Sequence, residues 1–270
     1  MSGMTRWLRR SGWKDPGGPK PKTPGRKAMK RRVSDDGAST ISLPAGRLAI
    51  GAAVAALLLL AGLHVLSPEF DPSWRMVSEY ANGRFGWILS LMFACWGLSS
   101  CALAYAIRSQ ARTIPARVGV VLLLLAGVGQ GMAAVFDLNH VILHNVAGLL
   151  GMGGVPVAAM LISVSLSRIQ AWSPSRRALL IAANATWISV ILLAASFVVM
   201  VTTFMATGMA TPAQPPKVLP AGVIGLVGWA NRLLVLSYCL WAVTVARKGI
   251  KLAGRSAHRP VVEERDYRLG

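Results

Sequence analysis

The sequence predicts an all-α membrane protein with six transmembrane helices, both termini in the cytoplasm and a short interfacial helix in the first outer loop. The 270 residues are 54% hydrophobic and only 14% charged, which is unlike the composition of an ordinary soluble domain. A bilayer core needs roughly 20 consecutive apolar residues per helix. Six runs meet this length, and they cover residues 46–66, 85–107, 116–136, 145–166, 178–206 and 220–246.

The distribution of charge predicts the orientation. The formal net charge of +19 is carried by residues 1–47, by the loops 108–117 and 167–177, and by the tail 247–270. On the other side, and inside the helices, basic and acidic residues balance. Alternate loops therefore follow the positive-inside rule, and we expect a multi-pass plasma-membrane protein with cytoplasmic termini. Because topology accounts for the charge, it does not indicate a nucleic-acid partner.

Three regions follow: a basic cytoplasmic arm (1–45), the six-helix domain (46–246) and a basic cytoplasmic tail (247–270). The arm has too few apolar residues to fold alone, so we expect it to be disordered. It either serves only to fix the orientation of the protein or contacts anionic headgroups through its Lys and Arg residues. Translation could also begin at Met29. The first apolar run is too long for a cleaved signal peptide and is expected to be a signal anchor.

The first outer loop predicts a short amphipathic helix over residues 72–81. Asp71 suits its N-cap, and the proline that follows suits its first position. We expect Trp74 and Tyr80 to lie at headgroup depth. The segment either packs the outer ends of the helices or caps a cavity, with Glu79 turned inward. His64, just before this loop, is expected at the membrane interface.

Polar residues are concentrated between the third and fourth runs. Gln130 lies seven residues before Asp137, so both face one way if the helix continues. An N-cap at Asn139 would place His140 and His144 one turn apart on the next helix. Three interpretations stay open: helix capping at the water boundary, a headgroup or ligand site, or a metal site. Zinc favours two imidazoles and a carboxylate, which here would be Asp137, His140 and His144.

The later helices contain one residue that needs a partner. Arg232 lies near the middle of the sixth run, where a guanidinium costs from about 2.5 kcal/mol upward unless it is paired. Asp137 and Glu79 are the acids close enough in depth, so we expect either an ion pair or a cation that holds a phosphate or carboxylate. Pro156 should kink the fourth helix. Three glycines at 222, 225 and 228 predict a close-packing face on the sixth helix, and the three cysteines are expected to be packing residues.

Several short motifs resemble those of a bacterial membrane family called domain of unknown function 998. The similarity covers roughly residues 46–246. It is carried by a proline near the end of the first helix, Ser78-Glu79-Tyr80-Ala81, Gly83, Gly86-Trp87, Phe136-Asp137, His144 with Gly148, and Gly228 with Asn231-Arg232. The resemblance implies six helices in a bacterial inner membrane and no established activity.

The function that we favour is non-catalytic: binding of a lipid headgroup or small anion in an outward-facing polar pocket. Its candidate residues are Arg232, Asp137, His144, Glu79 and Gln130. The first alternative is a metal-dependent membrane hydrolase with Asp137, His140 and His144 as zinc ligands and Glu79 as general base. The second is a transporter, although the sequence shows no inverted repeat. Membrane lipids are the expected partners, no cofactor other than zinc is indicated, and the oligomeric state is open.

Overall fold

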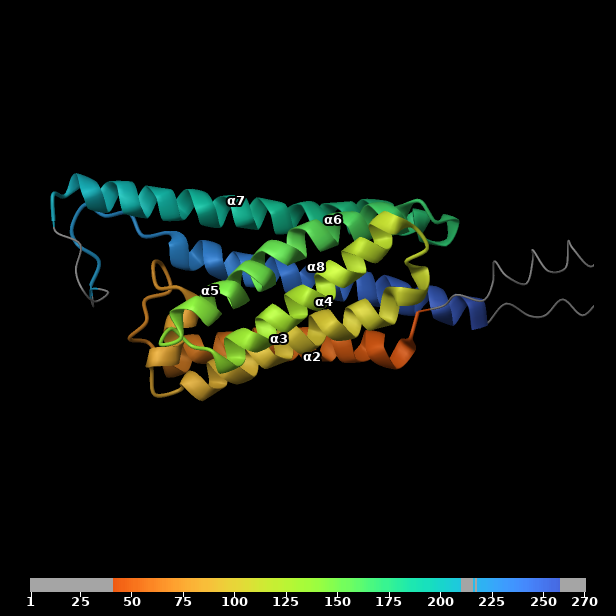
Figure 1. Cartoon of the computed structure of the whole chain (residues 1–270), viewed down its shortest axis with the longest axis horizontal. Helices are drawn as coiled ribbons and strands as arrows, with labels where there is room; N and C mark the ends of the chain where they lie inside the picture. Colours follow the sequence, from red (N-terminus) through yellow and green to blue (C-terminus); the bar gives the residue numbers. More distant parts are fainter. Residues whose placement is uncertain (1–40, 210–215, 217, 258–270) are drawn as a thin grey trace, which may run out of the picture. The chain divides into compact units, whose positions relative to one another are not determined.

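A computed structural model describes residues 41–209, 216 and 218–257. Within these residues the structure is all-helical, and six helices are long and apolar enough to cross a membrane, which confirms the predicted all-α fold with six membrane-spanning helices (Figure 1). The predicted disorder of the arm and the possible start at Met29 concern residues that lie outside this part of the chain, as does most of the predicted tail.

The spans follow one another in an antiparallel bundle (Figure 1). The first three are α2 (Leu43–Leu66), α3 (Gly86–Ile107) and α4 (Ile114–Val135). The fourth is composite and consists of α5 (Val141–Gly148), a π-helical turn η3 (Leu149–Gly153) and α6 (Gly154–Ser167). The last two are α7 (Arg176–Ala206) and α8 (Val227–Ala257). Short 3₁₀ helices occur at Val77–Asn82 (η1), Arg108–Gln110 (η2) and Gln170–Ser175 (η4).

The packing order explains where a site can form. Helix α2 packs on α3 and α8, α3 packs on α4, and α4 packs on α6. Helix α7 packs mainly on α6 and α8, and it lies at the margin of the bundle (Figure 1). Helix α8 also contacts α3 and η1. Because it packs on α2 as well, the last span of the chain lies directly against the first.

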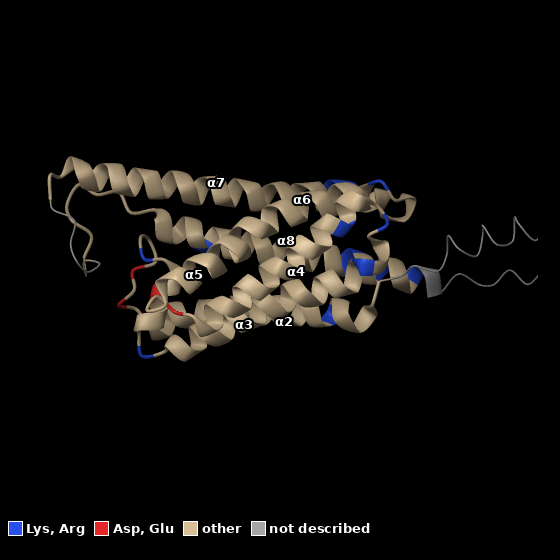
Figure 2. Cartoon of the chain, viewed as in Figure 1, with Lys and Arg blue, Asp and Glu red and all other residues tan. Residues whose placement is uncertain are grey.

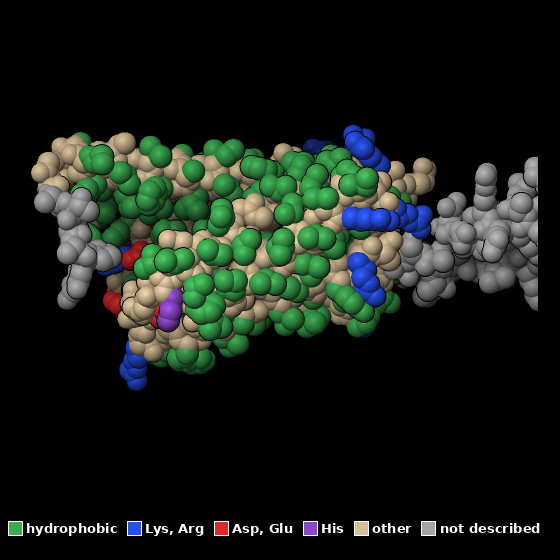
Figure 3. Space-filling model, viewed as in Figure 1, with side chains coloured by type: hydrophobic (Ala, Val, Ile, Leu, Met, Phe, Trp, Pro, Cys, Tyr) green, Lys and Arg blue, Asp and Glu red, His purple; other side chains and the backbone are tan. Residues whose placement is uncertain are grey.

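Charged residues concentrate towards the two ends of the bundle (Figure 2). Most of the described Lys and Arg residues lie near the end of the bundle where α2 begins and α8 ends, and we call this the basic end. The described acids Glu69, Asp71, Glu79 and Asp137 lie at the opposite, acidic end. Between them hydrophobic side chains cover the visible face, as expected for a lipid-facing surface (Figure 3).

Three local predictions are wrong. The sixth helix begins at Val227 rather than at 220 and continues to Ala257 rather than ending at 246. Gly222 has a φ of 87°, so the chain turns there and Gly222 and Gly225 are not on the helix. The first helix starts at Leu43, inside the predicted arm.

The first outer loop also differs from the predicted helix over 72–81. The carboxylate of Asp71 accepts hydrogen bonds from the backbone N–H and the hydroxyl of Ser73, at 2.9 and 2.7 Å. The backbone N–H of Arg75 also donates to the carbonyl oxygen of Asp71 at 3.0 Å, so Asp71 caps a single turn, and a helical segment begins only with η1 at Val77. Trp74 and Tyr80 are buried within the protein, 8% and 1% exposed, rather than placed among lipid headgroups.

Candidate functional site

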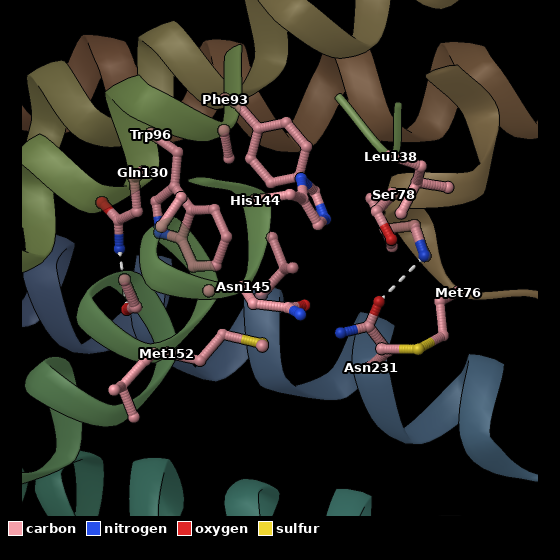
Figure 4. A pocket seen from close by; sticks show the side chains of 17 residues that line it. Met76, Ser78, Phe93, Trp96, Gln130, Leu138, His144, Asn145, Met152 and Asn231 are labelled. Carbon is pink, nitrogen blue, oxygen red and sulfur yellow. Dashed lines mark hydrogen bonds between the residues drawn. The ribbon is translucent and has the colours of Figure 1, made fainter. Parts of the chain in front are cut away.

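A cavity of about 260 Å³ lies inside the bundle, and its lining includes Ser78 and Leu138, the sequence neighbours of two acids at the acidic end. Figure 4 shows the side chains that line it. Its walls come from the loop at η1, from α3 and α4, from the α5–η3 segment and from α8. Its lining is mostly apolar, and the polar side chains among the described residues are those of Ser78, Gln130, His144, Asn145 and Asn231. Two of these, His144 and Gln130, belong to the predicted site; Arg232, Asp137 and Glu79 do not line the cavity.

The π-helical turn η3 forms one wall of the cavity. Gly129 in α4 permits this, because a Cβ atom there would lie 2.7 Å from the backbone nitrogen of Gly151 and 2.8 Å from the carbonyl oxygen of Ala147. Gln130 then donates to the carbonyl oxygen of Gly151 at 3.4 Å and accepts from the Ser100 hydroxyl at 2.7 Å. Gln130 is therefore a buried link between α3, α4 and η3, and π-helical turns often occur at functional sites.

Pro156 interrupts the backbone hydrogen bonding of the fourth span shortly after η3 ends. A proline has no N–H, so the carbonyl oxygen of Met152, four residues earlier, lacks its helical donor. The Tyr238 hydroxyl supplies the missing hydrogen bond from α8, at 2.6 Å. The predicted distortion near Pro156 is thus an interruption of helical hydrogen bonding that fastens the fourth span to the sixth.

His144 presents a hydrogen-bond acceptor to the cavity. Its Nδ1 donates to the carbonyl oxygen of Phe136 at 2.9 Å, because a carbonyl can only accept. In the neutral ring Nε2 then carries no proton and can accept from a ligand. Figure 4 shows the ring directed into the space that Ser78, Asn145 and Asn231 also face.

Asn231 presents donors to the same space. Its Oδ1 accepts from the backbone N–H of Val77 at 2.9 Å, so the loop at η1 fixes the amide and leaves its NH₂ group towards the cavity (Figure 4). Within the described residues the side chains of Ser78 and Asn145 have no hydrogen-bond partner. The cavity thus offers donors and acceptors without a charged side chain among its described lining residues.

Arg232 is buried, 7% exposed, and is bonded to neutral acceptors. Its Nε donates to Nε2 of His64 at 2.6 Å, and one terminal nitrogen donates to the carbonyl oxygens of Arg75 at 2.7 Å and Gly228 at 2.9 Å. The other terminal nitrogen donates to the Tyr80 hydroxyl oxygen at 3.1 Å, and the guanidinium also faces the Tyr80 ring. Arg232 therefore holds α8, α2 and the first outer loop together.

The expected ion pairs of Arg232 are absent among the described residues. Glu79 pairs with Arg75 at 2.6 Å instead, and its other oxygen accepts from the Met76 backbone at 2.8 Å. It is therefore engaged within its own loop rather than turned into the cavity. Carbonyl, phenol and imidazole acceptors satisfy the guanidinium in place of a carboxylate, which the sequence alone did not indicate.

Asp137 lies on the surface and bonds locally. It accepts from the backbone and side-chain amides of Asn139, at 3.0 and 2.9 Å, and contacts Nδ1 of His140 at 3.2 Å. The hydrogen bonds from Asn139, followed by that from His140, lower the pKa of Asp137 below its usual value. Helix α5 begins after His140, so Asn139 is not its N-cap and His140 precedes the helix. No group of three or more His, Cys, Asp or Glu residues in the described chain is arranged to hold a metal ion.

Sequence reasoning missed Asn145, Ser78 and the role of His64. Asn231 was also absent from the predicted site, although a polar side chain inside an apolar run, directly before Arg232, could have indicated it. His64 carried the same signal near the end of α2, but the interfacial interpretation accounted for it equally well. These residues come from distant parts of the chain, so only the packing shows that they meet.

A family model described as "Protein of unknown function (DUF998)" matches residues 49–248. The match includes every element that forms the cavity and the contacts of Arg232. No curated protein and no solved structure matches the chain significantly.

Proposed function

We propose, for a chain that belongs to the DUF998 family of proteins of unknown function, that its cavity binds the uncharged polar head of a membrane lipid. The six apolar helices make it an integral membrane protein. The observation that carries the proposal is the pairing of an acceptor, Nε2 of His144, with a donor, the amide of Asn231, in one mainly apolar cavity.

The character of the lining favours a hydroxyl-bearing head over an anion. A hydroxyl both donates and accepts, which matches His144, Asn231, Asn145 and Ser78 together. A phosphate is mainly a hydrogen-bond acceptor with a negative charge and would require donors in excess, commonly Arg or Lys. Arg232 would have to give up four hydrogen bonds to serve that purpose. We therefore propose a neutral headgroup rather than the small anion that the sequence also suggested.

The location suits a lipid. The cavity lies towards the acidic end, and the positive-inside rule would place that end on the outer side of a plasma membrane. Gln130 is five residues before the end of α4, which corresponds to a depth of roughly 7 Å at about 1.5 Å per residue. A headgroup near the interface can reach this depth.

The metal-dependent hydrolase gains no support from the described residues. Asp137 and His140 bond each other at the surface, whereas His144 uses Nδ1 for the Phe136 carbonyl and lines the interior. The three proposed ligands therefore do not converge. No described feature favours a transporter either, since a cavity of this kind is compatible with binding alone.

The test compares two lipids with identical tails. Purified protein in nanodiscs should bind dioctanoylglycerol, and dioctanoyl phosphatidic acid and inorganic phosphate should bind at least about tenfold more weakly. His144→Phe should lower the dioctanoylglycerol affinity about tenfold, because an acceptor is lost. His140→Phe is the matched control, since that ring is exposed and does not line the cavity. Preference for the phosphate-bearing lipid, or equal binding by wild type and His144→Phe, would overturn the proposal.

A further inference from the structure

A second hollow, of about 320 Å³, lies between α7 and α8. Every side chain along it is apolar, and four come from α7 at positions 190, 193, 194 and 197. This spacing places them on one face of the helix. Figure 3 shows a recess beside α7 in which hydrophobic side chains are visible. We call this hollow the α7–α8 groove.

On α7 the groove begins at Val190. The preceding residue, Ser189, joins α7 to α8, because its hydroxyl lies 2.9 Å from that of Ser237. Beyond this bond Leu193 and Ala194 face the groove, and Phe197 at its far part is 49% exposed. An apolar groove at membrane depth is not a site for water, so hydrocarbon is the occupant that its lining fits.

Two residues line both the cavity and the groove: Met76 and Met152. Methionine is unbranched and flexible, and its side chain adapts to irregular apolar shapes. Gly153, beside Met152, also lines the groove, and a Cβ atom there would find only Leu149 within 4 Å, at 3.8 Å. The wall between the polar cavity and the apolar groove therefore consists of the flexible side chains of Met76 and Met152. Beside this wall, at Gly153, few atoms lie close to the backbone.

We infer that one lipid occupies both spaces, with its polar head in the cavity and one hydrocarbon tail passing between Met76 and Met152 into the α7–α8 groove. This inference rests on the proposed function and makes it specific. The expected ligand is a lipid with an uncharged, hydroxyl-bearing head and at least one long hydrocarbon chain. The groove supplies affinity through burial of methylene groups, and the cavity supplies selectivity for the head.

The test uses two probes with the same glycerol head: oleoyl glycerol, with a long tail, and butanoyl glycerol, with a short one. Ala194→Trp should fill the groove and lower the affinity for oleoyl glycerol about tenfold or more, without changing that for butanoyl glycerol. Ala195→Trp is the matched control, because Ala195 is exposed on α7 and does not line the groove. Gly153→Leu, which fills the groove from the opposite wall, should reproduce the effect of Ala194→Trp.

The possible failures are distinguishable. If Ala194→Trp and Ala195→Trp bind oleoyl glycerol equally while His144→Phe weakens both probes, the head lies in the cavity but the tail does not use the groove, and the inference is overturned. If His144→Phe changes neither probe, the proposed function fails and the inference fails with it. Thermal unfolding of each variant shows whether the bundle is intact, and a folded Gly153→Leu protein decides the matter if Ala194→Trp does not fold.

Discussion

Nε of Arg232 donates a 2.6 Å hydrogen bond to Nε2 of His64, and this bond joins the last transmembrane helix, α8, to the first, α2. Nδ1 of His64 donates to the carbonyl oxygen of Leu60 at 2.7 Å while Nε2 accepts from Arg232, which is the pattern of a neutral ring with its proton on Nδ1. The guanidinium is thus held by an imidazole lone pair, two carbonyls and a phenol oxygen.

His64→Phe should destabilise the protein, because one N–H of a buried guanidinium loses its acceptor. A loss of about 1–3 kcal/mol is expected for an unsatisfied buried group. His64→Gln should retain part of the stability, since the Gln carbonyl can accept in place of Nε2. Thermal unfolding in one detergent compares the three proteins, and equal midpoints for wild type and His64→Phe would contradict the assignment.

Double-mutant cycles should separate true from expected partners of Arg232. Arg232→Lys combined with His64→Phe should be strongly non-additive, because both changes remove the same hydrogen bond. Arg232→Lys combined with Asp137→Asn should be additive, since Asp137 bonds Asn139 and His140 instead. Unfolding midpoints provide the measurement. Non-additivity between Arg232 and Asp137 would contradict the structure, in which these two residues do not form an ion pair.

Gly228→Ala should detach the first outer loop from α8. A Cβ atom at Gly228 would lie 2.6 Å from the carbonyl oxygen of Arg75 and 2.9 Å from the backbone nitrogen of Trp74, so backbone has to move. Gly131→Ala in α4 is the control, since nothing lies within 4 Å of the added atom. The control should be stabilised by up to about 1 kcal/mol, as Ala favours a helix over Gly. Protease cleavage within the loop should rise for Gly228→Ala only; cleavage unchanged from wild type would mean that the loop docks by other contacts.

Tyr238→Phe should cost about 1–3 kcal/mol, because the Met152 carbonyl oxygen then has neither a helical donor nor a hydroxyl. Adding Pro156→Ala should recover much of this loss, since the new N–H can bond that carbonyl within the helix. Denaturation of the single and double variants tests the compensation. A double variant that is less stable than Tyr238→Phe alone would show that Pro156 contributes in another way.

The sequence was sufficient for the six spans, because a bilayer requires long apolar runs and the chain has six of them. It also singled out His144, Gln130 and Arg232 as polar side chains that need partners. It was wrong about the partner of Arg232, because depth in the membrane was the only available criterion and it favoured Asp137 and Glu79. Charge complementarity suggested a carboxylate, whereas backbone carbonyls, which are present in every sequence, accept two of the four hydrogen bonds, and His64 and Tyr80 accept the other two.

The run lengths and the distribution of charge in the sequence determined that this is a six-helix membrane protein whose charges divide between its two ends. Only the tertiary structure decided that Arg232 supports the fold while His144 and Asn231, 87 positions apart, face one cavity. The physical reason is that hydrophobicity acts locally along the chain, so a sequence displays it directly. Hydrogen bonding between helices depends on rotation and packing, which are fixed only when all six helices are in place.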